Sequence, residues 1–148
     1  SEEFFRMGEK HGEQKFYHDD GGLQGLQHCR NGMKCNEWET YNKDTSIQST
    51  IKYQNGIKTY ECSYRKYSSF DKDRIPQIVK EINYVDGKMD GNYLDCFVNG
   101  KRRTEGKMVN GEMNSKWNFY MNDGNTLELS VDMDAGEIVR VNYKRYLS

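Results

Sequence analysis

The sequence repeats itself with a period of about 24 residues. YVDGKMDGNYLDCFVNGK at 84–101 and MVNGEMNSKWNFYMNDGN at 108–125 agree in their turn residues and in the positions of their large side chains. A glycine marks the same point of each copy, and these anchor glycines are Gly8, Gly32, Gly56, Gly87, Gly111 and Gly136. A recurring period of this length predicts a repeat protein, in which each copy is one small unit that packs against its neighbours.

Eight of the 14 glycines follow Asn or Asp, whereas roughly two would do so by chance at this Asn and Asp content. Asn-Gly and Asp-Gly tolerate positive φ at both central residues of a type I′ turn, the turn that matches the twist of antiparallel strands. Tight turns are therefore predicted at Asn31-Gly32, Asn55-Gly56, Asp86-Gly87, Asn99-Gly100, Asn110-Gly111 and Asp123-Gly124.

Between the turns, apolar and polar residues alternate, which is typical of strands with one favoured face. The clearest run is Leu127, Leu129, Val131 and Met133. The prediction is an all-β fold, an elongated antiparallel β-meander of roughly ten to twelve strands built from about five to six hairpin repeats. A single domain over 1–148 is expected, with copies at about 5–28, 29–52, 53–83, 84–107 and 108–132 and a partial copy at 133–148.

The third copy is longer than the others, and its extra residues fall near 67–77. This stretch is polar and charged and holds the only proline of the chain, so it predicts an enlarged loop. A helix is the alternative, because apolar residues between Ile75 and Ile82 also recur at helical spacing. The repeat register favours a strand over 78–84 and is compatible with a short helical turn around 71–76.

Aromatic side chains recur six and nine residues after the anchor glycine. The first position holds Trp38, Tyr93 and Trp117, and the second holds Tyr17, Tyr41 and Tyr120. A spacing of three places the two positions on opposite faces of a regular strand, unless a bulge turns one of them. The sequence leaves this open. These six residues are the candidate binding residues, since Trp and Tyr contribute much of the energy of binding surfaces. Stacking of each repeat on the next is the favoured role.

Four segments resemble MORN-type repeats, namely GEKHGEQKFYHDDG at 8–21, NGMKCNEWETYNKD at 31–44, DGKMDGNYLDCFVNG at 86–100 and NGEMNSKWNFYMNDG at 110–124. More narrowly, they are similar to the bacterial MORN-variant repeats described as the antitoxin component of toxin–antitoxin systems. The resemblance covers about residues 5–131. The third copy departs from the pattern, with Cys62 and Arg65 where aromatics are expected, and the second has Asp44-Thr45 where an Asn-Gly would stand.

The four cysteines are expected to be structural thiols. Cys29, Cys62 and Cys96 stand where the other copies have apolar or aromatic residues, whereas Cys35 stands in a polar position. Their spacings match neither a zinc site nor a small disulfide framework. Stacking of the repeats leaves a single bridge open as an alternative.

No motif for catalysis or metal binding is found in the sequence. His11, His18 and His28 have no carboxylate at ligand spacing. DMDAGE at 132–137 fails as a calcium loop, because Tyr143 stands where a glutamate is needed. No Ser, Cys or Lys lies in a nucleophile motif. The chain is therefore predicted to be no enzyme and to use no cofactor or metal.

Charge and hydropathy exclude further classes of protein. The net charge of −1 offers no basic field for nucleic acid. The chain has no apolar run long enough to span a membrane and no signal-peptide pattern. A cytoplasmic protein is expected, and an extracytoplasmic one would require a signal peptide removed before Ser1.

The predicted function is a non-enzymatic, protein-binding repeat module. The resemblance implies an antitoxin or immunity protein that neutralises a toxin-like protein partner by direct contact. The alternative is a structural or cell-surface repeat protein that binds glycan or membrane components through its aromatic residues. An accessory domain of a larger enzyme is the third interpretation.

Overall fold

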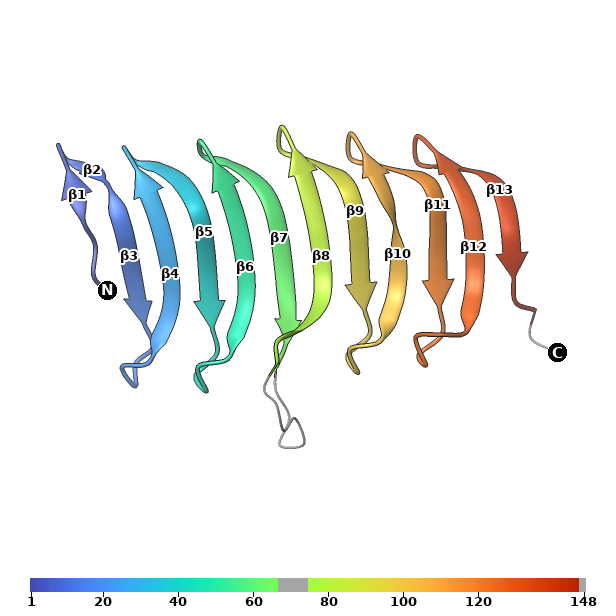
Figure 1. Cartoon of the computed structure of the whole chain (residues 1–148), viewed down its shortest axis with the longest axis horizontal. Helices are drawn as coiled ribbons and strands as arrows, with labels where there is room; N and C mark the ends of the chain where they lie inside the picture. The colour runs from blue at the N-terminus through green and yellow to red at the C-terminus, as the bar shows by residue number, and fades with distance from the viewer. Residues whose placement is uncertain (67–74, 147–148) are drawn as a thin grey trace. The chain divides into compact units, whose positions relative to one another are not determined.

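The computed structural model describes residues 1–66 and 75–146, in which it contains strands and no helix (Figure 1). The predicted all-β fold is therefore confirmed. The chain divides into two compact units, Ser1–Gln77 and Ile78–Ser148.

The first unit contains an antiparallel meander and a short hairpin. Its strands are β1 (Phe5–Arg6), β2 (Glu9–Lys10), β3 (Gly12–Tyr17), β4 (Leu23–Arg30), β5 (Met33–Tyr41), β6 (Ile47–Gln54) and β7 (Ile57–Arg65). Strands β3 to β7 pair in chain order, and β1 pairs with β2. The N-terminal segment continues this pattern, because Glu2 forms an antiparallel bridge with Lys15 of β3.

The second unit is also an antiparallel meander. They are β8 (Gln77–Val85), β9 (Lys88–Cys96), β10 (Arg102–Val109), β11 (Glu112–Tyr120), β12 (Leu127–Asp134) and β13 (Glu137–Lys144), again paired in chain order. The predicted strand over 78–84 is confirmed, and the helical alternative is wrong there. Most of the predicted loop at 67–77 and of the turn at 71–76 lies outside the described residues.

Each sheet is a single layer. Within each unit the strands contact chiefly their neighbours in the sheet, and Figure 1 shows no second layer of described elements over either one. A one-layer sheet buries few residues completely, which explains how a chain with 30% charged residues supports this fold.

The predicted turns are of two kinds. Both central residues have positive φ at Asn31-Gly32, Asn55-Gly56, Asp86-Gly87 and Asn110-Gly111, as a type I′ turn requires. The tight turns predicted at Asn99-Gly100 and Asp123-Gly124 are also present, but they are not of type I′, because only Gly100 and Gly124 have positive φ there. There the glycine is the fourth residue of a turn, and its N–H donates to the carbonyl of Phe97 or Met121.

The turn glycines of the first kind also join successive repeats. The N–H of Gly32 donates to the carbonyl of Lys10 at 2.9 Å, and that of Gly111 donates to Met89 at 2.8 Å. Equivalent bonds run from Gly56 to Lys34 and from Gly136 to Met113. The anchor glycine therefore both closes its own hairpin and binds the preceding one.

Thr45 occupies a left-handed position that glycine holds in the corresponding turns. Its φ is 67°, and its N–H donates to Asn42 as that of Gly100 donates to Phe97. A left-handed conformation costs a residue with a Cβ roughly 1–2 kcal/mol. Replacing Thr45 with glycine would remove this cost. Part of the resulting gain in stability would be lost, because glycine has greater freedom in the unfolded chain.

We therefore expect Thr45→Gly to raise the free energy of unfolding by about 1 kcal/mol, measured by urea denaturation. Thr45→Ala keeps a Cβ and serves as the matched control, with little change expected. A Thr45→Gly variant no more stable than the alanine variant would contradict the assignment of strain to this turn.

Candidate binding surface

The position six residues after the anchor glycine follows a β-bulge in several copies. The bulge residues Asn36, Gly91 and Ser115 have φ of 56°, 106° and 62°, and the pairing register shifts beside each of them. Each lies two residues before Trp38, Tyr93 or Trp117. We call the sheet face that carries Trp38 in the first unit, and Tyr93 and Trp117 in the second, the tryptophan face.

In the second unit, the tryptophan face carries the core. Trp117 is only 3% exposed and clusters with Met108, Val131 and Met133. Its indole lies over Gly106 of the neighbouring strand, where an added Cβ would come within 2.2 Å of a ring carbon. Tyr93 pairs with Gly106 from the other side, and the ring centroids of Tyr93 and Trp117 are 5.4 Å apart. Gly106 thus leaves the space in which the two aromatic rings meet.

The indole N–H explains why tryptophan suits this position. Trp117 Nε1 donates to the carbonyls of Lys107 at 3.1 Å and Asn114 at 3.2 Å, which flank the register shift. Trp38 Nε1 donates in the same way to the carbonyl of His28 at 3.0 Å. A bulge removes backbone groups from the regular ladder, and buried carbonyls need a donor. The side chain at this position supplies it.

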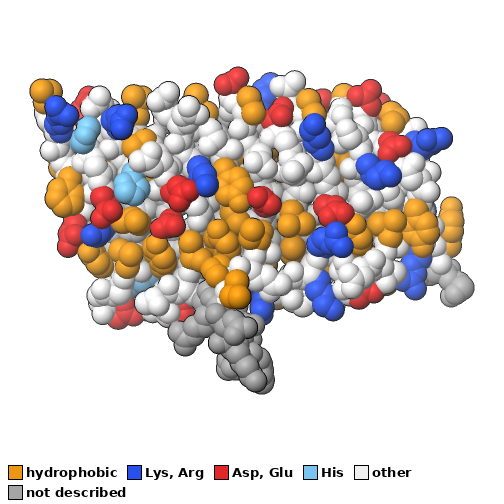
Figure 2. Space-filling view, viewed as in Figure 1, with side chains coloured by type: hydrophobic (Ala, Val, Ile, Leu, Met, Phe, Trp, Pro, Cys, Tyr) orange, Lys and Arg blue, Asp and Glu red, His pale blue; other side chains and the backbone are white. Residues whose placement is uncertain are grey.

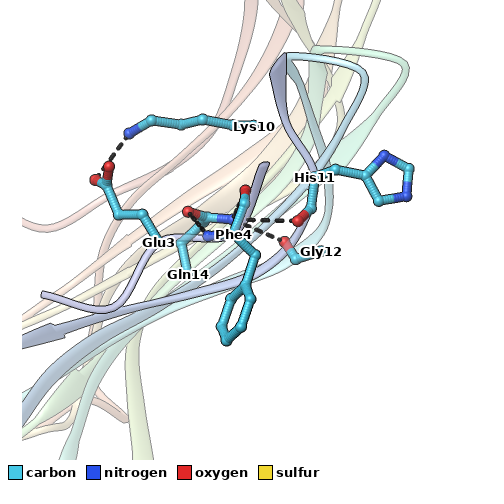
Figure 3. A network of polar contacts seen from close by, with 6 residues as sticks. All are labelled: Glu3, Phe4, Lys10, His11, Gly12 and Gln14. Atoms are coloured by element: carbon cyan, nitrogen blue, oxygen red, sulfur yellow. Dashed lines mark hydrogen bonds and ion pairs between the residues drawn. The ribbon is translucent and has the colours of Figure 1, made fainter. Parts of the chain in front are cut away.

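In the first copy, Gln14 takes the place of the tryptophan. Its carboxamide Nε2 donates to the carbonyl of Phe4 at 3.0 Å, and its Oε1 accepts the N–H of Phe4 at 3.1 Å. Figure 3 shows this amide pointing toward the backbone of Phe4, His11 and Gly12. Gln14 is 1% exposed. Gln14 was not among the residues predicted from the sequence, although its spacing from Gly8 is the spacing of Trp38 from Gly32.

Trp38 is less buried than its counterpart in the second unit. Its ring lies 5.0 Å from that of Tyr53, and the ammonium of Lys34 lies 4.5 Å from the Trp38 ring and 5.0 Å from that of Tyr53. The residue at the place of Gly106 is Gln27, which lies in the register shift between β4 and β5. The first unit therefore covers this ring with a cation instead of an apolar cluster.

Tyrosines nine residues after the anchor glycine lie on the other face. Glu105 pairs with Asn118 across the strands, and the Tyr120 hydroxyl donates to Glu105 at 2.5 Å. The Tyr41 hydroxyl donates to Glu39 at the same distance. We call this side, which carries Tyr41 in the first unit and Tyr120 in the second, the tyrosine face. Both faces thus carry aromatics, which settles the question that the spacing left open.

The six candidate binding residues differ in exposure. Trp117 is buried, and Tyr17 is 37% exposed. Trp38, Tyr41, Tyr93 and Tyr120 are partly buried. In the space-filling view, hydrophobic side chains lie at the surface of each unit among scattered charges (Figure 2). Large side chains therefore remain at the surface of the sheets, where no second layer covers them.

A network of polar groups surrounds Glu105. Burial raises the pKa of this carboxyl, but hydrogen bonds from Tyr120, Asn118 and Arg102 outweigh burial, so that the pKa is lowered. Burial is the largest cause of the raised pKa of Tyr120, and the hydrogen bond to Glu105 raises this pKa further. The Arg102 guanidinium lies 3.2 Å from Glu105 Oε2 and 4.9 Å from the centre of the Tyr120 ring. The carboxylate is thus held ionised between a hydroxyl, an amide and a guanidinium.

The corresponding tyrosine of the first unit makes a pH-dependent contribution to stability. Burial, followed by its hydrogen bond to Glu39, raises the pKa of Tyr41 to about 12, from about 10 in an unfolded chain. Because the folded-state pKa is the higher one, this contribution is fully present below about pH 10 and is lost as the pH rises toward 12. In an absorbance titration of tyrosinate, Tyr41→Phe should remove a component that titrates near pH 12. A titration curve unchanged above pH 11 would contradict this assignment.

All four cysteines are free. The prediction of buried thiols is confirmed for Cys29 and Cys62, which are 7% and 0% exposed, whereas Cys35 and Cys96 are partly buried. Cys62 stands six residues after the anchor Gly56, which is the spacing of the tryptophan position, but it does not lie on the tryptophan face. It pairs with Thr50, which pairs with Glu39, so it lies on the tyrosine face. The reason is that the register shift between β6 and β7 adds fewer residues than the bulge before Trp38.

The sequence was compared with protein-family models and with curated proteins. No protein-family model matches it, and no curated protein is significantly similar to it in sequence. Within residues 1–66 and 75–146, no three His, Cys, Asp or Glu side chains are grouped to hold a metal ion, and no helix is long and apolar enough to cross a membrane. The fold defines the chain as a single-layer, antiparallel β-repeat protein.

Proposed function

We propose that this chain is a non-enzymatic, protein-binding repeat module, and that the tryptophan face of the second unit receives its protein partner. The supporting observation is an apolar surface around the buried cluster, formed by the partly buried Met89, Tyr93, Met113, Phe119 and Leu129. Contiguous apolar surface on a soluble protein is typical of an interaction site. Methionine side chains adapt to different partner shapes, which suits such a site.

A comparison of the repeats supports this assignment. Two residues after the anchor glycine, the first unit has Lys10, Lys34 and Lys58, whereas the second has Met89 and Met113. The same hairpin position is therefore charged in one unit and apolar in the other. Folding does not require methionine there, since three copies form their hairpins with lysine. We infer that the methionines serve binding.

The resemblance to MORN-variant repeats gives this proposal its biological form. In that role the chain is an antitoxin or immunity protein, and its partner is a toxin that it masks by direct contact. The hairpin repeats and the quoted segments support this interpretation. Glycan binding through stacked rings is less well supported, because Trp117 is buried and Lys34 lies over the rings of Trp38 and Tyr53.

The experiment is affinity capture by the purified chain, followed by reconstitution with the purified partner. The test variant is Met89→Lys with Met113→Lys, which copies the lysines of the first unit and should leave the melting temperature within a few degrees. We expect it to weaken partner binding at least tenfold. Val139→Lys, at a residue that is 63% exposed, is the single-charge control. Equal affinity of the double variant and the wild type would refute this binding face.

A further inference from the structure

The second unit shows how a tyrosine and a glutamate of the tyrosine face hold an arginine. Arg102 Nη1 donates to Glu105 Oε2 at 3.2 Å, and its guanidinium carbon lies 4.9 Å from the centre of the Tyr120 ring. The Tyr120 hydroxyl donates to the other oxygen, Oε1, at 2.5 Å. One carboxylate therefore binds a hydroxyl and a guanidinium at once, and the ring contacts the cation. This combination suits a planar guanidinium better than an ammonium.

The first unit contains the same tyrosine–carboxylate pair. The Tyr41 hydroxyl donates to Glu39 Oε2 at 2.5 Å. In the second unit the carboxylate belongs to the first residue of the cross-strand pair Glu105–Asn118. The corresponding pair of the first unit is Leu26–Glu39, in which the second residue carries the carboxylate. Directly opposed residues lie on one face of a sheet. The carboxylate therefore lies beside its tyrosine in both units.

The first unit lacks the arginine. Arg102 stands nine residues before its anchor glycine, and the residue nine before Gly32 is Leu23. Among the described residues, no lysine or arginine forms an ion pair with Glu39. Its neighbour on the same face, Glu37, is paired with Lys52 at 2.7 Å. Glu39 is thus a partly buried carboxylate that the described chain leaves without a cation.

We propose that Glu39 and Tyr41 bind an arginine side chain of the protein partner. This inference rests on the proposed protein-binding function and names the chemistry that the partner presents to the first unit. Glu39 Oε1 would accept the guanidinium while Oε2 keeps the Tyr41 hydroxyl, and the ring would contact the cation as Tyr120 contacts Arg102. A hydrogen-bonded guanidinium–carboxylate pair is stronger than a neutral hydrogen bond.

The test uses a fluorescent tri-arginine peptide and the full chain. We expect saturable, one-to-one binding that exceeds the binding of tri-lysine. Glu39→Gln should reduce the affinity about tenfold, the loss of one charged hydrogen bond. Glu37→Gln, which removes the same charge from the same face, should change it less than about twofold. Leu23→Arg should fill the site from within the chain and also abolish binding.

A gain of binding completes the test. Arg102→Leu exposes the Tyr120–Glu105 pair of the second unit and should raise the stoichiometry from one peptide to two, a result that unfolding cannot produce. Absence of binding to the wild type, equal binding of tri-lysine, or equal loss in the Glu39 and Glu37 variants would overturn the proposal. None of these results bears on the Met89 and Met113 variant, so a failure here leaves the proposed function standing.

Discussion

Trp117→Ala is expected to lower the free energy of unfolding by about 3–5 kcal/mol, the range for deleting a buried tryptophan. The indole is 3% exposed and packs on Met108, Val131 and Met133. The variant also leaves the carbonyls of Lys107 and Asn114 without their indole donor, which adds to the cost. Such a loss is a large part of the stability of a small domain. Urea denaturation followed by circular dichroism measures it.

Trp38→Ala is the matched control at the same repeat position. It also removes a hydrogen bond to a bulge carbonyl, that of His28. However, Trp38 is only partly buried and is covered by Tyr53 and Lys34 rather than by an apolar cluster. We expect its cost to be about half that of Trp117→Ala, since less apolar area is lost. If Trp117→Ala leaves stability unchanged, the assignment of Trp117 to the core is wrong.

Gly106→Ala is expected to destabilise the second unit by about 3 kcal/mol or more, at the upper end of the range for overpacking. The new Cβ would lie 2.2, 2.4 and 2.7 Å from three ring carbons of Trp117. These distances are far inside van der Waals contact. The indole is also held by its hydrogen bonds to Lys107 and Asn114, so it cannot move without losing them. Thermal and urea unfolding measure the effect.

Gly25→Ala is the control for Gly106→Ala. Gly25 is also a strand glycine without positive φ, but a Cβ there would meet only the Glu39 carbonyl at 3.4 Å and a Phe16 ring carbon at 4.0 Å. We expect a change within about 1 kcal/mol. In a Trp117→Ala background, the cost of Gly106→Ala should largely disappear, since the two residues are in direct contact. Equal costs in both backgrounds would contradict the proposed clash.

Local chemistry made much of the fold predictable. An Asn-Gly pair adopts a type I′ turn through the preferences of two residues, and apolar alternation predicts a strand through its neighbours alone. The antiparallel pairing of strands at a 24-residue period followed from these signals. An Asp-Gly pair can also serve in a strand. Gly91, for example, follows Asp90, yet it lies in the bulge before Tyr93 and not in a turn.

The sequence by itself determined the all-β class, the positions of the hairpins and the identity of the recurring aromatic positions. Only the tertiary structure decided which face each aromatic occupies. A bulge can change the face of the residues that follow it, and its effect depends on the number of extra residues that one strand has opposite its partner. That count put Cys62 on the tyrosine face and Trp38 on the tryptophan face. It also brought Gly106 under Trp117, and Gln14 to the backbone of Phe4. Such contacts join residues of different segments of the chain, and no local preference encodes them.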